Sequence, residues 1–384
     1  MTLIPRDLDV WVLAGQSNME GVGVLTSALA PDPRVWSFTS AGQWEIAAEP
    51  LHCFWESFTP IHQNLIRPGL PEDQQACSDA ELAAQQRRER RFGAGLGLAF
   101  GQVMAQATGK PVGLIPAAHG GTSLEQWSSA GKAEGGNSLY GAMLLRIARA
   151  GGNVRGVLWY QGESETWDAS ATTRYGERFT AWVTALRTDL NRPDLPILTV
   201  QLGRTTLPDL NGAHWDIVRQ AQYDLPDRVP FLTVTSAIDL ALEDVIHINT
   251  AGLVRLGTRL ARQMLALDGV AGYQAHPRVT RVARIPGHPG QGAVRIECTG
   301  VTGGWHPTDN MAGFGITDAA GQELPNNRVF NALPDPEDPS AILLRLNLPA
   351  EPGERITYAQ GLFPYANVSD QADMPLCAFA QPVE

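Results

Sequence analysis

Cysteine is scarce in this sequence, with four residues among 384 and no Cys-x-x-Cys pair. A chain of this length can bury enough apolar surface to fold without disulfides, so it is not a small disulfide-held scaffold. The spacing also argues against a zinc site made of cysteine clusters. We expect all four to be free thiols: Cys53, Cys77, Cys298 and Cys377.

Long hydrophobic runs are missing as well. No stretch of about 18 apolar residues occurs, which excludes a membrane-spanning helix. The segment 1–9 lacks the charged start and apolar stretch of a secretory signal. As the sequence is written, we expect a cytoplasmic protein that does not insert into membranes.

Positive charge is in short supply. Lys and Arg total 29 against 40 Asp and Glu, and 29 − 40 gives a net charge of −11. Such a surface repels polyanions, so we expect neither nucleic acid nor an anionic membrane as a partner. Hydrophobic residues make up 43% and charged residues 18%, a balance typical of a folded globular chain.

Short apolar runs alternate with helical patterns over the first two-thirds of the chain. Buried strands are predicted at 10–14, 112–116, 154–160, 196–202 and 229–235. Helices are predicted between and after them, at about 95–108, 138–150, 174–190, 214–224 and 250–267. This alternation predicts an α/β fold, a three-layer α/β/α sandwich around a mostly parallel sheet.

Two segments depart from this rhythm. The segment from about 40 to 92 is rich in Pro, Trp and His, and we expect an insertion that shapes a pocket, with its charged run at 87–91 on a solvated helix face. After about residue 276, short strand-like runs at 279–282, 293–296 and 342–346 are separated by turn residues. We therefore expect a large α/β domain over 1–275 and a small all-β domain over 276–384.

Two glycine-containing runs follow the first two predicted strands, where open α/β sheets place their active sites. In Gly-Gln-Ser-Asn-Met at 15–19, Ser17 stands at a strand-to-helix turn that can project its hydroxyl into a crevice. In His-Gly-Gly-Thr-Ser at 119–123, adjacent glycines let backbone N–H groups approach a ligand. Taken alone, Ser17 can equally be a helix N-cap and the glycine pair an ordinary loop.

Polar residues follow two later strands. The amide of Gln161 can complete an oxyanion hole, and Glu163 can bond a histidine. In Asp-Val-Ile-His at 244–247, the carboxylate of Asp244 can reach the nearer imidazole nitrogen of His247 while the other nitrogen faces outward. Each residue also has a structural interpretation, as a helix cap or a strand end that satisfies loop backbone.

These four runs, in this order, resemble those of the SGNH (GDSL-like) hydrolase superfamily, and more narrowly its sialate O-acetylesterase and acetylxylan esterase branch (carbohydrate esterase family 6). The segments 215–222, 252–261 and 358–367 are similar to that branch as well. Ile248 departs from it, because relatives commonly have proline after the histidine. The resemblance implies an SGNH, flavodoxin-like fold and no metal or organic cofactor.

The resemblance also implies roles for individual residues. Ser17 would be the nucleophile and His247 the general base, oriented by Asp244 or, as the competing acid, by Glu163. The oxyanion hole would consist of the Ser17 and Gly121 backbone N–H groups and the Gln161 amide. Substrate contacts are expected from Gln16, Asn18, Gly120 and Trp127. A tryptophan ring can stack on a sugar or belong to the hydrophobic core, and both interpretations apply to Trp55, Trp127, Trp159 and Trp167.

We therefore expect a serine esterase that removes O-acetyl groups from a sugar through an acetyl-enzyme. Three alternatives stay open at this point. The chain can be a catalytically silent carbohydrate-binding protein, or a lipase or thioesterase of the same superfamily. A metallohydrolase would use His119, His247 and Asp244.

Overall fold

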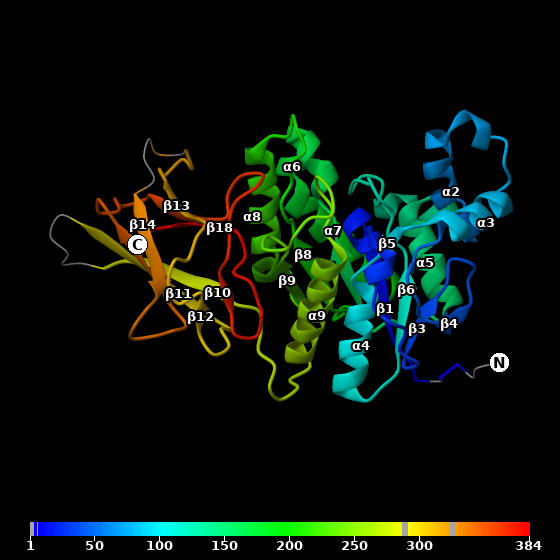
Figure 1. Ribbon diagram of the computed structural model, residues 1–384, viewed down its shortest axis with the longest axis horizontal. Helices are drawn as coiled ribbons and strands as arrows, with labels where there is room; N and C mark the ends of the chain where they lie inside the picture. The colour runs from blue at the N-terminus through cyan, green and yellow to red at the C-terminus, as the bar shows by residue number, and fades with distance from the viewer. Residues whose placement is uncertain (1–3, 6, 286–290, 323, 325–327) are drawn as a thin grey trace.

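A seven-stranded sheet with the order β4-β3-β6-β1-β7-β8-β9 lies at the centre of the molecule (Figure 1). The structure is a computed structural model and describes residues 4–5, 7–285, 291–322, 324 and 328–384. All neighbouring strands of this sheet are parallel except β4, which runs antiparallel to β3. The strands are β1 (Asp9–Gly15), β3 (Val35–Phe38), β4 (Trp44–Ile46), β6 (Val112–Pro116), β7 (Gly156–Tyr160), β8 (Ile197–Gln201) and β9 (Leu232–Ser236).

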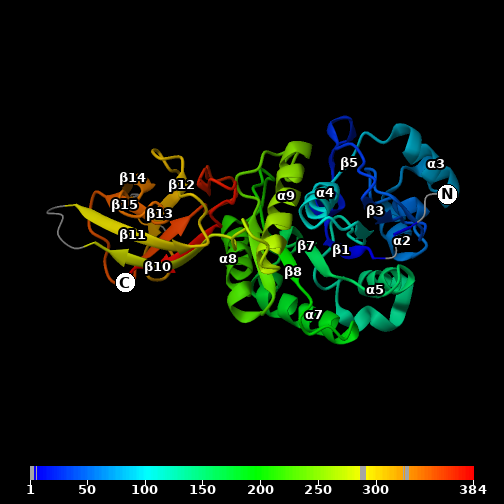
Figure 2. The same cartoon turned by 90° about the horizontal axis from the view of Figure 1, so that it is seen from below.

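Helices cover both faces of the sheet. Helices α4 (Gly97–Thr108) and α9 (Thr250–Leu267) lie on one face, and α5 (Leu139–Arg149), α7 (Tyr175–Asp189) and α8 (Gly212–Arg228) on the other (Figure 2). Strands β6, β7 and β8 are buried along their whole length because helices cover both of their faces. The predicted α/β/α sandwich is confirmed, as are its five predicted strands and five predicted helices.

The order of the strands indicates where a site is expected. The five predicted strands lie in the order β6-β1-β7-β8-β9, so the chain first moves from β1 to one side and then returns to the other. The strand order reverses between β1 and β7, and open α/β sheets bind ligands at such a point, beyond the carboxyl ends of the strands. The loops that follow β1 and β7 therefore meet at the expected position of a site.

The segment 40–92 extends the sheet at the β3–β4 edge and continues in short helices (Figure 1). Helix α3 (Asp79–Glu89) begins with a capping box between Ser78 and Glu81, and it ends in the exposed part of the predicted charged run. The other elements of this part are η2 (Phe54–Glu56), α2 (Ile61–Ile66), η3 (Arg67–Gly69), η4 (Glu72–Gln74) and β5 (Phe92–Ala94), which pairs with β2 (Gly23–Val24). Strands β3 and β4 had not been predicted.

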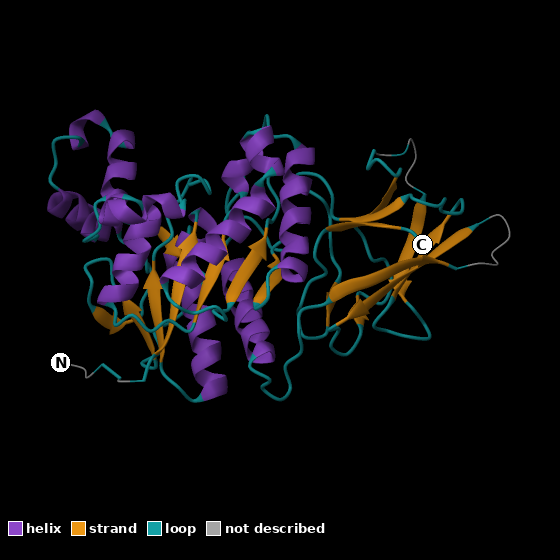
Figure 3. Cartoon of the chain, turned by 180° about the vertical axis from the view of Figure 1, so that it is seen from behind, coloured by secondary structure: helices purple, strands orange, loops and turns teal. Residues whose placement is uncertain are grey.

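The C-terminal β region, residues 276–384, consists of antiparallel strands and loops (Figure 3). Its sheets have the orders β10-β11-β15-β14, β13-β16-β18 and β12-β17. The strands are β10 (Arg278–Arg284), β11 (Gly292–Thr299), β12 (Trp305–His306), β13 (Phe314–Thr317), β14 (Val329–Pro334), β15 (Ile342–Leu346), β16 (Arg355–Tyr358), β17 (Ser369–Asp370) and β18 (Phe379–Pro382). Its hydrophobic core includes Tyr223, Val234 and Ile238 of the α/β part, so the two parts are packed together.

Two sequence predictions concern the chain as a whole. All four cysteines are free, as expected. None of the helices in the described part of the chain is both long and apolar enough to cross a bilayer. The division into domains at residue 275 stays a prediction.

Candidate active site

A tight turn at the end of β1 presents Ser17. Gly15 has φ +130°, and a Cβ at this position would lie 2.1 Å from the Tyr160 carbonyl oxygen on the neighbouring strand β7. Only glycine fits there, and the Gln16 N–H then donates to the same carbonyl (2.9 Å). The chain turns at once into the short helix α1 (Ser17–Glu20), and Ser17 stays partly exposed at the carboxyl edge of the sheet.

His247 lies against Ser17. It belongs to the loop between β9 and α9, and its Nε2 is 2.9 Å from Ser17 Oγ. Its Nδ1 is 2.7 Å from Asp244 Oδ2, while Asp244 Oδ1 accepts the backbone N–H groups of Ile246 and His247 at 2.9 and 2.8 Å. Partial burial acts to raise the pKa of Asp244, but these hydrogen bonds outweigh it and hold the pKa below its usual value. Asp244 is thus an ionised partner for the imidazole.

Glu163, the competing acid, has a different partner. Its Oε1 accepts the Asn18 side-chain N–H at 2.9 Å, and its Oε2 has no hydrogen-bond partner among the described residues. The side chain is buried, which raises its pKa. No hydrogen bond joins it to His247 in the described part of the chain. Of the two acids, the structure therefore brings Asp244 to the imidazole.

The loop 119–121 lies beside Ser17. A Cβ on Gly120 would be 3.4 Å from Ser17 Cβ, so the two backbones are close. The Gly120 N–H donates to Glu20 Oε2 at 2.9 Å, whereas the backbone N–H groups of Ser17 and Gly121 have no acceptor among the described residues. Gly121 has φ +68° and open space around it. The backbone N–H groups of Ser17 and Gly121, the two expected in the oxyanion hole, are thus not engaged by an acceptor among the described residues.

Glu20 is a site residue that the sequence reasoning missed. Burial raises its pKa to about 7, against the opposing effects of the Arg90 charge and the Gly120 N–H. A titratable carboxyl group therefore contacts the loop next to the serine. Its position directly after the run 15–19 was the available signal.

Gln161 does not take the position expected of an oxyanion donor, and that prediction is corrected. The side chain is fully buried, and its NH2 group donates to the Thr122 carbonyl oxygen (3.1 Å) and to the Glu165 carboxylate. Reversing the amide would turn its oxygen toward two acceptors, so this orientation is fixed. Both N–H groups are therefore engaged by these two acceptors.

Asn18 is also corrected, from a substrate contact to a structural connection. It is buried, donates to Glu163 and accepts the Ile248 N–H at 3.0 Å, so it joins the turn after β1 to the loop of His247. Gln16 is buried with its Oε1 near the N–H groups of Gly162 and Ser164, at 3.4 Å each. Its amide nitrogen has no acceptor among the described residues, and it is the part of this side chain that can meet a substrate.

The tryptophans divide clearly. Trp127 is fully buried, donates to Thr122 Oγ1 at 3.0 Å and packs edge-on against the buried Trp159. Trp55 is buried as well. None of these three can stack on a sugar, which corrects the expectation for Trp127. Trp167, at the end of η6 (Glu163–Trp167), is 60% exposed.

His119 belongs to a buried histidine pair. Its Nδ1 is 3.0 Å from His62 Nδ1, and Phe54 stacks on both rings. Burial lowers the pKa of His119 to about 4 and that of His62 well below its ordinary value. The pair therefore stays neutral near neutral pH and fixes the start of the glycine loop against the segment 40–92. The hydrogen-bond partner of the His119 ring is therefore a side chain of that segment.

No group of three or more His, Cys, Asp or Glu side chains within the described residues is arranged to hold a metal ion. His119, His247 and Asp244, the ligands that a metallohydrolase would need, are therefore not gathered into one site. The chemistry available from the geometry is nucleophilic attack by a hydroxyl activated by an imidazole.

Comparisons with known proteins identify relatives. Residues 7–266 match the family model described as "Carbohydrate esterase, sialic acid-specific acetylesterase". A protein of Arabidopsis thaliana named "Probable carbohydrate esterase" is 29% identical over 279 residues, 67% of this chain and 90% of the relative. The structure of that plant protein matches with a TM-score of 0.51 and covers 67% of this chain and 97% of its own.

A second structure matches both parts of the molecule. It is described as a novel carbohydrate acetylesterase from Xanthomonas citri, is 21% identical and has a TM-score of 0.68. The match covers 97% of this chain and 80% of the other. At this identity it shows the fold, including that of the C-terminal β region.

Proposed function

The chain belongs to the family of carbohydrate esterases described as sialic acid-specific acetylesterases, and we propose that it is a serine esterase that removes O-acetyl groups from a carbohydrate. One observation carries the proposal. Ser17 Oγ, the two nitrogens of His247 and Asp244 Oδ2 form a continuous line of contacts of 2.9 and 2.7 Å at the carboxyl edge of the sheet. A binding protein has no need of such a line.

In the proposed acylation step, Ser17 Oγ attacks the acetyl carbonyl carbon as its proton moves to His247 Nε2. Asp244 holds the proton on Nδ1 and stabilises the imidazolium. The negative charge on the carbonyl oxygen is met by the backbone N–H groups of Ser17 and Gly121. The tetrahedral intermediate collapses when His247 protonates the departing sugar oxygen, which leaves an acetyl group on Ser17.

Deacylation repeats these steps with water. His247 Nε2 takes a proton from the water as it attacks the acetyl carbon, and the same two backbone donors meet the oxyanion. Collapse breaks the bond to Ser17 Oγ, which recovers the proton from His247, and acetic acid leaves. The acid then releases its remaining proton to the solvent and becomes acetate, while His247 Nε2 and Ser17 Oγ return to the contact of 2.9 Å.

Two side chains of the segments that follow β1 and β7 fit a polar leaving group that carries hydroxyls. The unpaired amide nitrogen of Gln16 can bond a hydroxyl, and Trp167 offers a ring for stacking on a sugar. We propose an acetylated carbohydrate as the substrate, with acetylated sialic acid and acetylated xylan as the first candidates.

The test is acetate release from a panel of esters. The panel holds O-acetyl sialic acid, acetylated xylooligosaccharides, 4-nitrophenyl acetate and 4-nitrophenyl butyrate. Wild type is compared with Ser17→Ala and with Ser170→Ala, a matched control at an exposed serine. We expect wild type and Ser170→Ala to cleave an acetylated sugar, and Ser17→Ala to lose at least about 1,000-fold in kcat with an unchanged Tm.

Other outcomes assign the protein differently. Turnover by Ser17→Ala at the wild-type rate would remove Ser17 from the mechanism. Faster cleavage of butyrate than of acetate would favour a lipase or thioesterase. Sugar binding without cleavage of any ester would favour the carbohydrate-binding alternative.

A further inference from the structure

The loop that carries Asp244 and His247 is held from two sides. On the inner side, Asn18 accepts the Ile248 N–H. On the outer side, the carbonyl oxygen of Val245 accepts the Thr206 N–H at 2.8 Å and the Thr205 hydroxyl at 3.0 Å. Val245 is one residue from Asp244 and is itself 44% exposed, so these bonds, and not packing, hold the outer side of the loop.

Thr205 has a second partner, and it lies in the C-terminal β region. Its backbone N–H donates to the Leu362 carbonyl oxygen at 2.9 Å. Its hydroxyl, besides donating to Val245, accepts the Leu207 N–H at 3.1 Å. Thr205 is completely buried, and this one residue connects a carbonyl of the C-terminal β region with a carbonyl of the loop that carries Asp244 and His247, here called the catalytic loop.

The segment 359–363 around Leu362 is fixed to the α/β part. Both Asp216 carboxylate oxygens accept the Gly361 N–H, at 3.0 and 2.9 Å. The buried Arg219 donates to the carbonyl oxygens of Gly361 (2.6 Å) and Ala359 (3.3 Å). Hydrogen bonds to charged partners that are shielded from water are strong, so this segment is a rigid support.

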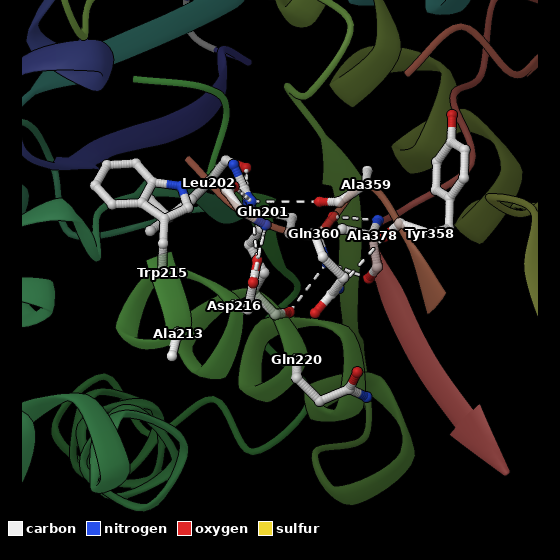
Figure 4. A network of polar contacts seen from close by, with 12 residues as sticks. Gln201, Leu202, Ala213, Trp215, Asp216, Gln220, Tyr358, Ala359, Gln360 and Ala378 are labelled. Atoms are coloured by element: carbon white, nitrogen blue, oxygen red, sulfur yellow. Dashed lines mark hydrogen bonds and ion pairs between the residues drawn. The ribbon is translucent and has the colours of Figure 1, made fainter. Parts of the chain in front are cut away.

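Neighbouring bonds extend the same attachment. Gln201, at the end of β8, exchanges two hydrogen bonds of 2.8 Å with the backbone of Ala378, and Gln220 accepts the Ala380 N–H at 2.8 Å. Figure 4 shows Gln201, Asp216 and Gln220 facing the C-terminal strands across this contact. Arg204 lies over the ring of Phe363 at 4.7 Å and donates to the Leu240 carbonyl, close to the start of the catalytic loop.

We infer that the C-terminal β region positions the general base: segment 359–363, acting through Thr205, holds the Asp244–His247 loop in the place from which His247 reaches Ser17. Thr205 is a positioning residue, since it acts through Val245 and does not touch the reacting atoms. The inference rests on the proposed function, because it takes His247 as the base. On this inference the C-terminal β region contributes to catalysis by holding the catalytic loop. This role differs from sugar binding, which would not need the contact with that loop.

The test uses three single variants of the full chain. Thr205→Val keeps the shape and the N–H donated to Leu362 but removes the hydroxyl, and Thr205→Ser restores the hydroxyl. Thr108→Val is the matched control: its hydroxyl also donates to a carbonyl (Met104) and accepts the N–H two residues later (Lys110), at the end of α4 remote from the carboxyl edge (Figure 1). The measurements are kcat and KM with 4-nitrophenyl acetate.

We expect Thr205→Val to lower kcat about tenfold with KM unchanged, because a displaced base weakens proton transfer but not substrate binding. Thr205→Ser should recover most of the rate, and Thr108→Val should keep it. Wild-type kcat in Thr205→Val would overturn the inference while leaving the proposed function intact. Absence of ester cleavage by the wild type would instead overturn the proposed function.

A second variant, Phe363→Ala, changes the C-terminal side of the same link, and we expect it to disturb folding less. Phe363 is 53% exposed, so Phe363→Ala should fold, and it releases Arg204 next to Leu362. We expect a smaller fall in kcat with KM unchanged. A rise in KM at constant kcat would assign Phe363 to substrate contact and overturn the positioning role.

Discussion

The choice between Asp244 and Glu163 as the partner of His247 can be decided by two isosteric substitutions, Asp244→Asn and Glu163→Gln. In the structure, Asp244 Oδ1 accepts two backbone N–H groups while Oδ2 faces His247 Nδ1. An asparagine must turn its oxygen toward those two donors. Its NH2 group then faces Nδ1, which forces the imidazole proton onto Nε2 and deprives Ser17 of its base.

The size of the effect has two parts. Two unit charges about 4 Å apart interact by about 4 kcal/mol at an effective dielectric constant of about 20. Because the Asp244 side chain is 50% exposed, solvent screening reduces this to about 2 kcal/mol, or about 30-fold in rate. The wrong tautomer adds to it, and loss of the carboxylate in such triads reaches about 10,000-fold. We expect kcat of Asp244→Asn to fall at least about 100-fold.

Glu163→Gln should behave differently. The buried Glu163 has a raised pKa, so burial favours the neutral form that glutamine resembles, and the glutamine oxygen can still accept the Asn18 N–H. We expect kcat within about threefold of wild type. Initial rates with 4-nitrophenyl acetate, with Tm as the folding control, measure both. The opposite result would refute Asp244 as the partner of His247. In that case Glu163→Gln would lose at least about 100-fold in kcat, while Asp244→Asn would keep about a tenth of the wild-type rate.

Three further predictions concern individual carboxyl and amide side chains. Above pH 7 Glu20 is ionised beside the forming oxyanion, and its negative charge opposes that of the oxyanion. The kcat of Glu20→Gln should therefore increasingly exceed that of wild type as pH rises through 7. Superimposable pH–rate profiles of the two enzymes would contradict this prediction. Glu49 also has a folded-state pKa raised to about 7 by burial, so its contribution to stability falls as pH rises from about 4.5 to 7; Glu49→Gln should gain Tm relative to wild type at pH 8 and not at pH 5. Asn18→Ala leaves Glu163 and the Ile248 N–H without this partner, and urea unfolding should show a loss of about 2 kcal/mol.

The pattern of the sequence predicted the elements that hold the site. Apolar runs bounded by turn residues gave the five central strands, because strands covered on both faces must be apolar throughout. Strands β3 and β4 were missed because they are short, with four and three residues, and because β4, at the edge of the sheet, is partly exposed and has a mixed pattern. The position of Ser17 directly after β1, and of His247 before α9, followed from the rule that loops at the carboxyl edge carry the chemistry.

The direction of individual side chains could not be predicted in the same way. Gln161 stands at the expected strand end, but its amide bonds Thr122 and Glu165 because the side chain is enclosed there. Asn18 is likewise enclosed between Glu163 and the loop of His247. A sequence shows that an amide follows a strand; which acceptor it meets depends on residues that only the folded chain brings near.

The role inferred for Thr205 could be predicted even less from the sequence than the directions of Gln161 and Asn18. Its bond to Leu362 joins one backbone group to another, and any residue other than proline can donate it. Such a contact cannot be recognised from composition or residue spacing, although it fixes the position of the segment 359–363 relative to the catalytic loop. The hydroxyl bond to Val245 does require a particular side chain, but threonine is common in loops, and the requirement becomes visible only when both carbonyls are seen beside it. The two ends of this link, Leu362 and Val245, are more than a hundred residues apart in the sequence. A catalytic purpose for the C-terminal β region therefore had to come from the three-dimensional contacts, and the Thr205 variants test it at the point where those contacts converge.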